Sequence, residues 1–242
     1  MSFRCQSQSG AQAKAIQTVG LSGTAFTMAG WFRRESAATI NGSILTAGTN
    51  GNNNRLQMET TANGGDIRFK NTNGFDGTDN VFTVADGEWV YVAMSCSGAT
   101  YNAWGWRDTT AEDRTTLASV SYTSITPDKY IIGGDSNVNP YWVPARGEYV
   151  HVRFWNAALD QTELEAERKS ATAVRPSGLV GDHPLASSAD ASDASGNGNV
   201  LTITGSTDLA TGSSYPTSIG SGASAVINKL FGPLGGPFHK LI

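Results

Sequence analysis

The stretch from Gly147 to Arg168 restricts the fold more than any other part of the chain. Its sequence, GEYVHVRFWNAALDQTELEAER, first alternates with a period of two and then changes to a helical period. The alternation predicts a β-strand with two distinct faces. One face holds Val150, Val152 and Phe154, and the other holds Tyr149, His151, Arg153 and Trp155. Beyond the strand, Asp160 and Glu163 have the spacing of a capping box. A short helix is therefore predicted near Thr162 to Lys169, with Leu164 as its apolar contact.

The composition of the whole chain is typical of short strands joined by tight turns. Charged residues make up 16% of the 242 residues, and 28 residues are glycine. Asn-Gly pairs supply the positive φ angles that two-residue hairpin turns need. They begin at Asn41, Asn50, Asn63, Asn73 and Asn197. A chain of this length and pattern is expected to form one β domain with terminal extensions.

Several segments match, in order and spacing, the strands of one known family. They are Phe26–Phe32, Ser43–Gly48, the pair Arg55–Met58 and Asp66–Phe69, Trp89–Met94, and Tyr130–Gly134. Together with the strand and helix above, they resemble the laminin G-like domains of the concanavalin A-like type. The resemblance covers about residues 2 to 210 and implies an all-β fold, an antiparallel β-sandwich jelly roll with one short helix.

The composition divides the whole chain into three parts. The jelly-roll domain is expected over residues 1–210, a Gly/Ser-rich linker over 211–224, and an extended apolar tail over 225–242. Because a jelly roll brings its first and last strands together, Val200–Thr204 is expected to pair near Phe3–Ser7. An apolar tail left in water is an aggregation hazard, so it is predicted to anchor the protein in an assembly. Its anchoring residues are Leu230, Phe231, Leu234, Phe238, Leu241 and Ile242.

Charge and hydropathy exclude two classes of partner. The formal net charge is −4, without a cluster of Lys or Arg, so nucleic acid is not an expected partner. No apolar run approaches the length of a membrane span, so no membrane partner is expected either. The first residues, Met1 to Gln6, are too polar to begin a signal peptide, so the chain as given is expected to carry no export signal.

Catalysis is not expected, although jelly rolls of this kind include glycosidases. Hydrolysis of a glycosidic bond needs two facing carboxyl groups, and related jelly-roll glucanases place them in a Glu-x-Asp-x-x-Glu strand. That pattern is missing, and Glu148 is alone on its strand. The helix carboxylates, Glu163, Glu165 and Glu167, are interpreted as a solvated charged face.

No cofactor follows from the residues, but the resemblance implies that calcium could bind at loop ends. Oxygen-rich loops offer Asp76, Asp79, Asp190 and Asp193 as candidate ligands. Each loop also has the composition of an ordinary turn, in which Asp and Asn side chains bond their own backbone, and both readings stay open.

Glycan binding would use aromatic rings for stacking and Asp or Asn for hydroxyl groups. The candidates are Tyr141 and Trp142, in a loop bracketed by prolines, with Asp135 and Asn137. Packing of this loop against the sandwich is the alternative.

Other aromatic, histidine and cysteine side chains are assigned to the structure. Trp31, Trp89 and Trp155 are expected to be structural, and His151, Arg153 and His183 to be surface or groove residues. Cys96 shares strand parity with Val90, Val92 and Met94, so burial as an apolar side chain is favoured over a disulfide with Cys5.

These features favour a virion protein. The resemblance implies a bacteriophage structural component, because laminin G-like domains are widespread in such particles. We expect a non-enzymatic decoration or tail-associated protein, which forms homo-oligomers, contacts other virion subunits, and either stabilises the particle or binds host glycans with its outward sandwich. It would be assembled in the host cytoplasm and released by lysis. The alternative is a free carbohydrate-binding module or a secreted lectin.

Overall fold

In a computed structural model, the protein is described over most of its predicted domain and over one short segment beyond it. The described residues are 3–5, 7–8, 11–12, 14–17, 21, 24–35, 41–48, 55–61, 66–71, 80–108, 114–116, 120–121, 125–134, 143–187, 190–204 and 216–219.

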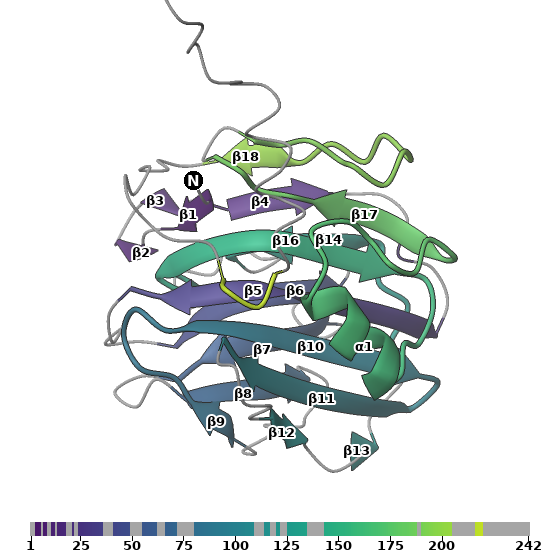
Figure 1. Ribbon diagram of the computed structural model, residues 1–242, viewed down its shortest axis with the longest axis horizontal. Coiled ribbons are helices and arrows are strands. Elements are labelled where there is room, and N and C mark those ends of the chain that lie inside the picture. Colours follow the sequence, from purple (N-terminus) through teal and green to yellow (C-terminus); the bar gives the residue numbers. More distant parts are fainter. Residues whose placement is uncertain are drawn as a thin grey trace, which may run out of the picture.

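Two sheets face each other in a sandwich, and the described helix lies outside one of them (Figure 1). We name the sheet beneath the helix the helix-side sheet and its opposite the far sheet. The order of the helix-side sheet is β1 (Phe3–Cys5), β16 (Gly147–Trp155), β5 (Ala25–Arg34), β10 (Trp89–Ser97), β11 (Thr100–Arg107) and β12 (Arg114–Thr116), with β17 (Leu179–His183) beside β16 and β13 (Val120–Ser121) beside β11.

The far sheet has the order β18 (Thr202–Thr204), β4 (Lys14–Gln17), β14 (Lys129–Ile132), β6 (Gly42–Gly48), β7 (Arg55–Thr60), β8 (Asp66–Asn71) and β9 (Asn80–Thr83). The short β15 (Val143–Pro144) pairs with β6 in parallel, whereas the other described pairs of both sheets are antiparallel. A small separate pair joins β2 (Ser7–Gln8) to β3 (Ala11–Gln12). The predicted antiparallel β-sandwich with one helix is confirmed.

The core between the sheets follows from the alternation of side chains along the strands. Phe32 and Met94 point inward from the helix-side sheet, and Leu56 and Ile132 from the far sheet. Each large side chain buried in this way contributes about 1.5–3 kcal/mol. Cys96 is fully buried in the same cluster, as its strand parity predicted.

A β-bulge at His151 divides β16 and changes which side chains face the core. The pairing with β5 shifts between Val150 and Arg153, and His151 has a left-handed backbone with φ of 48°. Such a conformation is uncommon for residues other than glycine and marks an extra residue in a strand. Tyr149 therefore faces the core with Val152 and Phe154, while Val150 faces outward with Arg153 and Trp155. The strict alternation predicted from the sequence is wrong across this bulge.

The bulge also divides the edge of β16 between two partners. Its first half pairs with β1 through Gly147 to Tyr149, and its second half pairs with β17 through Val152 to Trp155. The last described strand, β18, pairs with β4 in the far sheet. The prediction that it pairs near Phe3–Ser7 is wrong, because β1 belongs to the helix-side sheet.

The helix α1 (Gln161–Arg168) begins with the predicted capping box. The Asp160 carboxylate accepts a hydrogen bond from the Glu163 N–H, and the Glu163 carboxylate accepts one from the Asp160 N–H. Leu164 is buried in a second apolar cluster on the outer face of the helix-side sheet, with Trp31, Trp89 and Trp155. The predicted helix and the structural role of these tryptophans are confirmed. Among the described residues, no helix is long and apolar enough to span a membrane, since α1 has eight residues.

Candidate functional site

Most residues that the sequence predicted as sites lie outside the described part of the chain. These are the glycan candidates Tyr141, Trp142, Asp135 and Asn137, the calcium candidates Asp76 and Asp79, and the tail residues Leu230, Phe231, Leu234, Phe238, Leu241 and Ile242. Their roles, and the division of the chain into domain, linker and tail, stay predictions.

The remaining calcium candidates hold together the loop that follows β17. Asp193 accepts hydrogen bonds from the backbone N–H groups of Asp182, Ser195 and Asn199. Asp190 accepts bonds from the N–H groups of Ala186 and Ser192. These hydrogen bonds keep the pKa of the Asp193 carboxyl below its usual range, although partial burial alone would raise it. Among the described residues, no group of three or more His, Cys, Asp or Glu side chains is arranged to hold a metal.

His183 joins this loop to the far sheet through the interior of the sandwich. Its Nδ1 lies 2.9 Å from the carbonyl oxygen of Ser192, and its Nε2 lies 2.8 Å from the Tyr130 hydroxyl. A carbonyl oxygen can only accept, so the neutral ring has its proton on Nδ1 and accepts from Tyr130 on Nε2. Burial lowers the pKa of His183. The expectation that His183 is a surface or groove residue is wrong, since it is fully buried.

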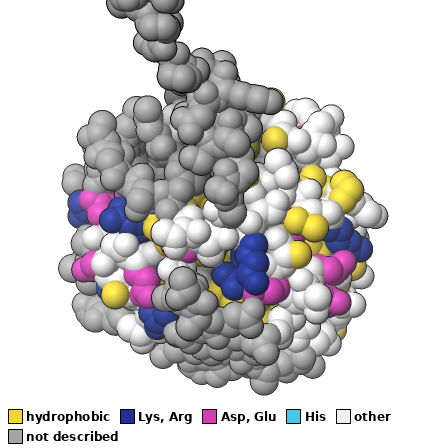
Figure 2. Space-filling view, in the orientation of Figure 1, with side chains coloured by type: hydrophobic (Ala, Val, Ile, Leu, Met, Phe, Trp, Pro, Cys, Tyr) yellow, Lys and Arg dark blue, Asp and Glu magenta, His cyan; other side chains and the backbone are white. Residues whose placement is uncertain are grey.

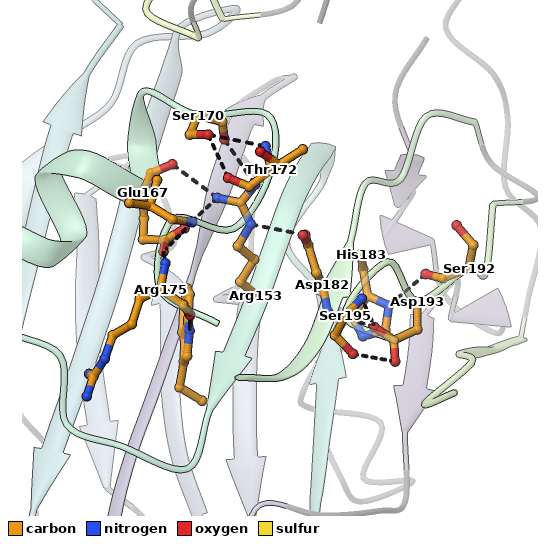
Figure 3. Close-up of polar contacts among 12 residues, drawn as sticks. Arg153, Glu167, Ser170, Thr172, Arg175, Asp182, His183, Ser192, Asp193 and Ser195 are labelled. Atoms are coloured by element: carbon orange, nitrogen blue, oxygen red, sulfur yellow. Dashed lines mark hydrogen bonds and ion pairs between the residues drawn. The ribbon is translucent and has the colours of Figure 1, made fainter. Parts of the chain in front are cut away.

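Arg153 lies at the centre of a buried ion-pair cluster between α1 and the helix-side sheet (Figure 3). Its Nε bonds Asp182 at 3.0 Å, and its Nη1 bonds the Glu167 carboxylate at 2.8 Å. Its remaining bonds go to the carbonyl oxygens of Glu167 and Ser170. The other Glu167 oxygen accepts the N–H groups of Val174 and Arg175.

This cluster corrects two sequence interpretations. Glu167 is buried rather than part of a solvated helix face, and Arg153 is not a groove residue. Burial raises the pKa of Glu167, while the Arg153 charge and the backbone bonds oppose that rise. The arrangement leaves these charges no role toward a ligand, because each is bonded within the protein. Its function is to fix α1 on the sheet.

The outer face of the far sheet carries a row of polar side chains that sequence reasoning missed. Alternate residues of β7 point outward, and Glu59 accepts hydrogen bonds from Gln57 Nε2 and from Arg68 Nε of the neighbouring β8. On β6, the Thr46 hydroxyl donates to the Gly134 carbonyl at 2.8 Å. We call Thr46, Gln57, Glu59 and Arg68 the polar row. Its signal in the sequence is the alternation Arg-Leu-Gln-Met-Glu-Thr over Arg55–Thr60.

The polar row combines burial with one unused hydrogen-bond acceptor. Thr46, Gln57 and Glu59 are all buried, while the Arg68 side chain keeps 22% exposure. Within the described part of the chain, Gln57 Oε1 has no hydrogen-bond partner. Buried polar atoms are nearly always bonded, so an atom without a partner indicates a place where a ligand or water supplies the missing donor.

The carboxylates considered for catalysis are paired with basic or backbone groups. Glu148 is buried and bonds Arg33 at 2.8 Å. Glu165 bonds Arg168, and Glu163 caps α1.

Comparison with known proteins places the chain in a family. Residues 7–165 match the family described as the concanavalin A-like lectin/glucanases superfamily, and the chain belongs to it. None of the curated proteins matches the chain.

Solved structures share this fold at low sequence identity. A heptameric SAP-like pentraxin from Limulus polyphemus is 12% identical, with a TM-score of 0.56 over 86% of this chain and 92% of that one. A candidate carbohydrate-binding protein from Bacteroides ovatus is 16% identical, with a TM-score of 0.54 over 82% of this chain and 59% of that one. A tailspike protein of an Escherichia coli O157:H7 bacteriophage is 16% identical, with a TM-score of 0.53 over 76% of this chain and 28% of that one. The fold is thus shared by a heptameric pentraxin, a candidate carbohydrate-binding protein and a bacteriophage tailspike.

Proposed function

We propose that this protein is a non-enzymatic component of a bacteriophage particle, a capsid decoration or tail-associated protein that displays its sandwich outward and binds host glycans. Membership of a lectin/glucanase superfamily supports the glycan-binding part. The pentraxin and the tailspike support the particle part of the proposal at the level of fold alone. One shows this fold in a heptamer, and the other shows it in a bacteriophage tailspike. The functional argument therefore depends on residues of this chain.

The observation that carries the proposal is the difference between the two outer faces of the sandwich. The helix-side sheet is covered by α1 and by the segment Pro216–Ile219, with Ile219 buried in the aromatic cluster. The far sheet carries the polar row instead. Sugar hydroxyl groups are recognised by a few well-placed amide and charged side chains of this kind. We assign glycan binding to the outer face of the far sheet.

The hydrogen bonds of the polar row orient its groups for such a ligand. Glu59 holds the amide nitrogen of Gln57, which leaves Gln57 Oε1 as the acceptor for a sugar hydroxyl. Glu59 also holds Nε of Arg68, the partly exposed member through which a ligand would reach the row. Because both Glu59 oxygens are engaged, the row supports binding without hydrolysis, which needs two carboxyl groups placed across the bond.

Attachment to the particle is assigned to the apolar tail. Side chains such as Phe231 and Phe238 each contribute about 1.5–3 kcal/mol when buried against a neighbour, and many copies act together. The protein would then be assembled in the host cytoplasm and leave the cell on the particle at lysis. A free carbohydrate-binding module or secreted lectin is the second candidate, which the Bacteroides ovatus structure supports at the level of fold.

Glycan binding is tested on an array of defined bacterial surface oligosaccharides, followed by titration calorimetry of any glycan that binds. We expect Gln57→Ala to weaken binding by about ten-fold, since one hydrogen bond to a buried group is lost. Gln161→Ala, the same substitution at the start of α1 beyond the other sheet, is the matched control. Equal binding by both variants, or no binding by the unaltered protein, contradicts the glycan proposal.

The assembly role is tested by deleting Ser224 to Ile242. The truncated protein should keep nearly the melting temperature of the full chain but no longer co-purify with particles. A truncated protein that unfolds, beside a full-length protein that is a plain monomer, would instead favour the free lectin.

A further inference from the structure

The segment Pro216–Ile219 forms a turn that Asp108 fastens to the helix-side sheet. The Thr217 and Ser218 N–H groups donate to the two Asp108 oxygens, at 2.5 and 2.8 Å. The Ile219 N–H donates to the Pro216 carbonyl at 3.4 Å and closes the turn. In Figure 1 this turn, drawn in yellow, lies in front of the same sheet as α1. The Thr217 hydroxyl also donates to Asp108, at 3.2 Å, so the carboxylate holds two successive backbone N–H groups and one hydroxyl of the turn.

An aromatic strip lies across the strands on this face of the sheet. Trp31, Tyr91 and Trp106 are cross-strand neighbours on β5, β10 and β11, with ring centroids 5.4 and 5.7 Å apart. Trp104 extends the strip along β11, with its ring 6.5 Å from Trp106 and nearly parallel to it. Ile219 belongs to the same buried cluster, so the turn supplies an aliphatic side chain to this strip.

Three hydrogen-bonding atoms of the strip have no partner in the described part of the chain. They are Tyr91 Oη, Trp104 Nε1 and Trp106 Nε1, on residues that are 1%, 5% and 1% exposed. Trp31, by contrast, donates its Nε1–H to the Arg168 carbonyl. The large majority of buried side-chain polar atoms in native proteins are bonded, so three unbonded donors in one strip are unusual. The resident turn satisfies Asp108 and fills the apolar position, but it leaves these donors unused.

We propose that the aromatic strip and Asp108 form a docking site for a peptide loop of a partner protein, and that Pro216–Ile219 is its resident competitor. The partner loop would offer two successive N–H groups to Asp108, an aliphatic side chain in the place of Ile219, and backbone carbonyls to the free donors. The described part of this face mixes acidic, basic and small hydrophobic areas, without one dominant charge (Figure 2). That surface fits a protein partner rather than a highly charged polymer. The inference rests on the proposed role in an assembly, where a neighbouring subunit supplies the loop.

The test uses the full chain and a fluorescein-labelled peptide, SYPTSIGS, which copies residues 214–221. In the Ile219→Ser protein the resident turn loses its apolar anchor, so the peptide should bind about ten-fold more tightly than to the unaltered protein. Adding Asp108→Ala should abolish binding, whereas adding Asp128→Ala, at an exposed position near the far sheet, should not. If Ile219→Ser does not fold, Thr217→Pro replaces it, since it removes both the N–H and the hydroxyl through which residue 217 bonds Asp108.

A second measurement examines the unused donors. Peptides that extend the same turn by a few residues on either side are titrated against the Ile219→Ser protein labelled with ¹⁵N-tryptophan. At least one should bind about ten-fold more tightly than SYPTSIGS and move the indole N–H signals of Trp104 and Trp106 downfield.

Three outcomes overturn the proposal: no peptide binding by a folded Ile219→Ser protein, no gain from any extended peptide, or binding of oligosaccharides rather than peptides by the opened strip. These measurements use isolated protein without particles and leave the polar row unchanged. A failure here is therefore distinct from a failure of glycan binding or of particle attachment.

Discussion

Removal of Arg153 should destabilise the protein more than any change at an exposed ion pair. Arg153 is completely buried, and its partners Glu167 and Asp182 are 1% and 4% exposed. The Arg153→Ala variant loses bonds to both carboxylates and to the carbonyls of Glu167 and Ser170. Both carboxylates then stay buried without their main positive partner.

The size of the effect follows from that burial. Breaking a buried ion pair by removing one partner costs about 3–5 kcal/mol, most of it from the charge left behind. In a domain of this size each kcal/mol lowers the melting temperature by roughly 2–4 °C, so Arg153→Ala should lower it by roughly 6–20 °C. The raised pKa of Glu167, caused first by burial, agrees with a carboxylate that depends on its partner.

Urea unfolding followed by circular dichroism and by tryptophan fluorescence measures this loss. Arg175→Ala is the control, because Arg175 pairs with Glu163 at 3.2 Å while the two side chains are 31% and 35% exposed. Exposed pairs contribute less than about 1 kcal/mol. Combining Arg153→Met with Glu167→Gln should recover part of the loss, since one uncompensated charge is then removed. A cost for Arg153→Ala no larger than that of the control would refute the reasoning that this cluster holds α1.

Three further predictions concern the helix cap, the bulge and pH. Asp160→Ala should cost about 0.5–2 kcal/mol in urea unfolding, because the capping box is lost; no change would mean that tertiary contacts alone fix the helix start. Gly30→Ala should cost about 1–3 kcal/mol, since a Cβ there would lie 2.7 Å from Val152 Cγ2, and the loss should shrink in combination with Val152→Ala; an undiminished loss would point to another cause. Burial lowers the pKa of His151 from 6.5 to about 4 and also lowers that of His183. The unfolded chain therefore binds more protons below pH 6.5, and the unfolding free energy should fall as pH drops from 6.5 toward 4, by up to about 1.4 kcal/mol per pH unit for each histidine. Replacing both histidines with Gln should flatten this slope, and an unchanged slope would contradict the assignment.

The sequence predicts those parts of the fold that depend on local pattern. The strands β5, β6, β10 and β14 are predicted from their resemblance, in order and spacing, to the strands of a known family, and α1 from the capping pair Asp160 and Glu163. These features need only nearby residues. The burial of Cys96 was predictable for the same reason, since parity along an unbroken strand fixes the face of every side chain.

The errors come from contacts that only the assembled sandwich creates. A bulge moves every later side chain to the opposite face, and nothing beside His151 in the sequence announces one. Glu167 resembles Glu163 and Glu165, its partly exposed neighbours on α1, and its burial depends on Arg153, which is distant in the sequence. The polar row was missed because outward residues of a strand are ordinarily solvated, and their burial is a tertiary property. The signal that was available is the strict alternation of polar and apolar residues along β7.

The bulge at His151 is what connects the fold to the outer cluster. If β16 continued beyond Tyr149 as a regular strand with every residue in strict alternation, Arg153 would face the core and Val152 would face α1, so the ion pairs with Glu167 and Asp182 could not form. The same bulge ends the pairing with β1 and lets β17 take over the edge of β16. That exchange places Asp182 beside Arg153 on one side and His183 beside Tyr130 on the other. The left-handed conformation of His151 is therefore compensated by two buried polar contacts, one that fixes the helix and one that joins the two sheets.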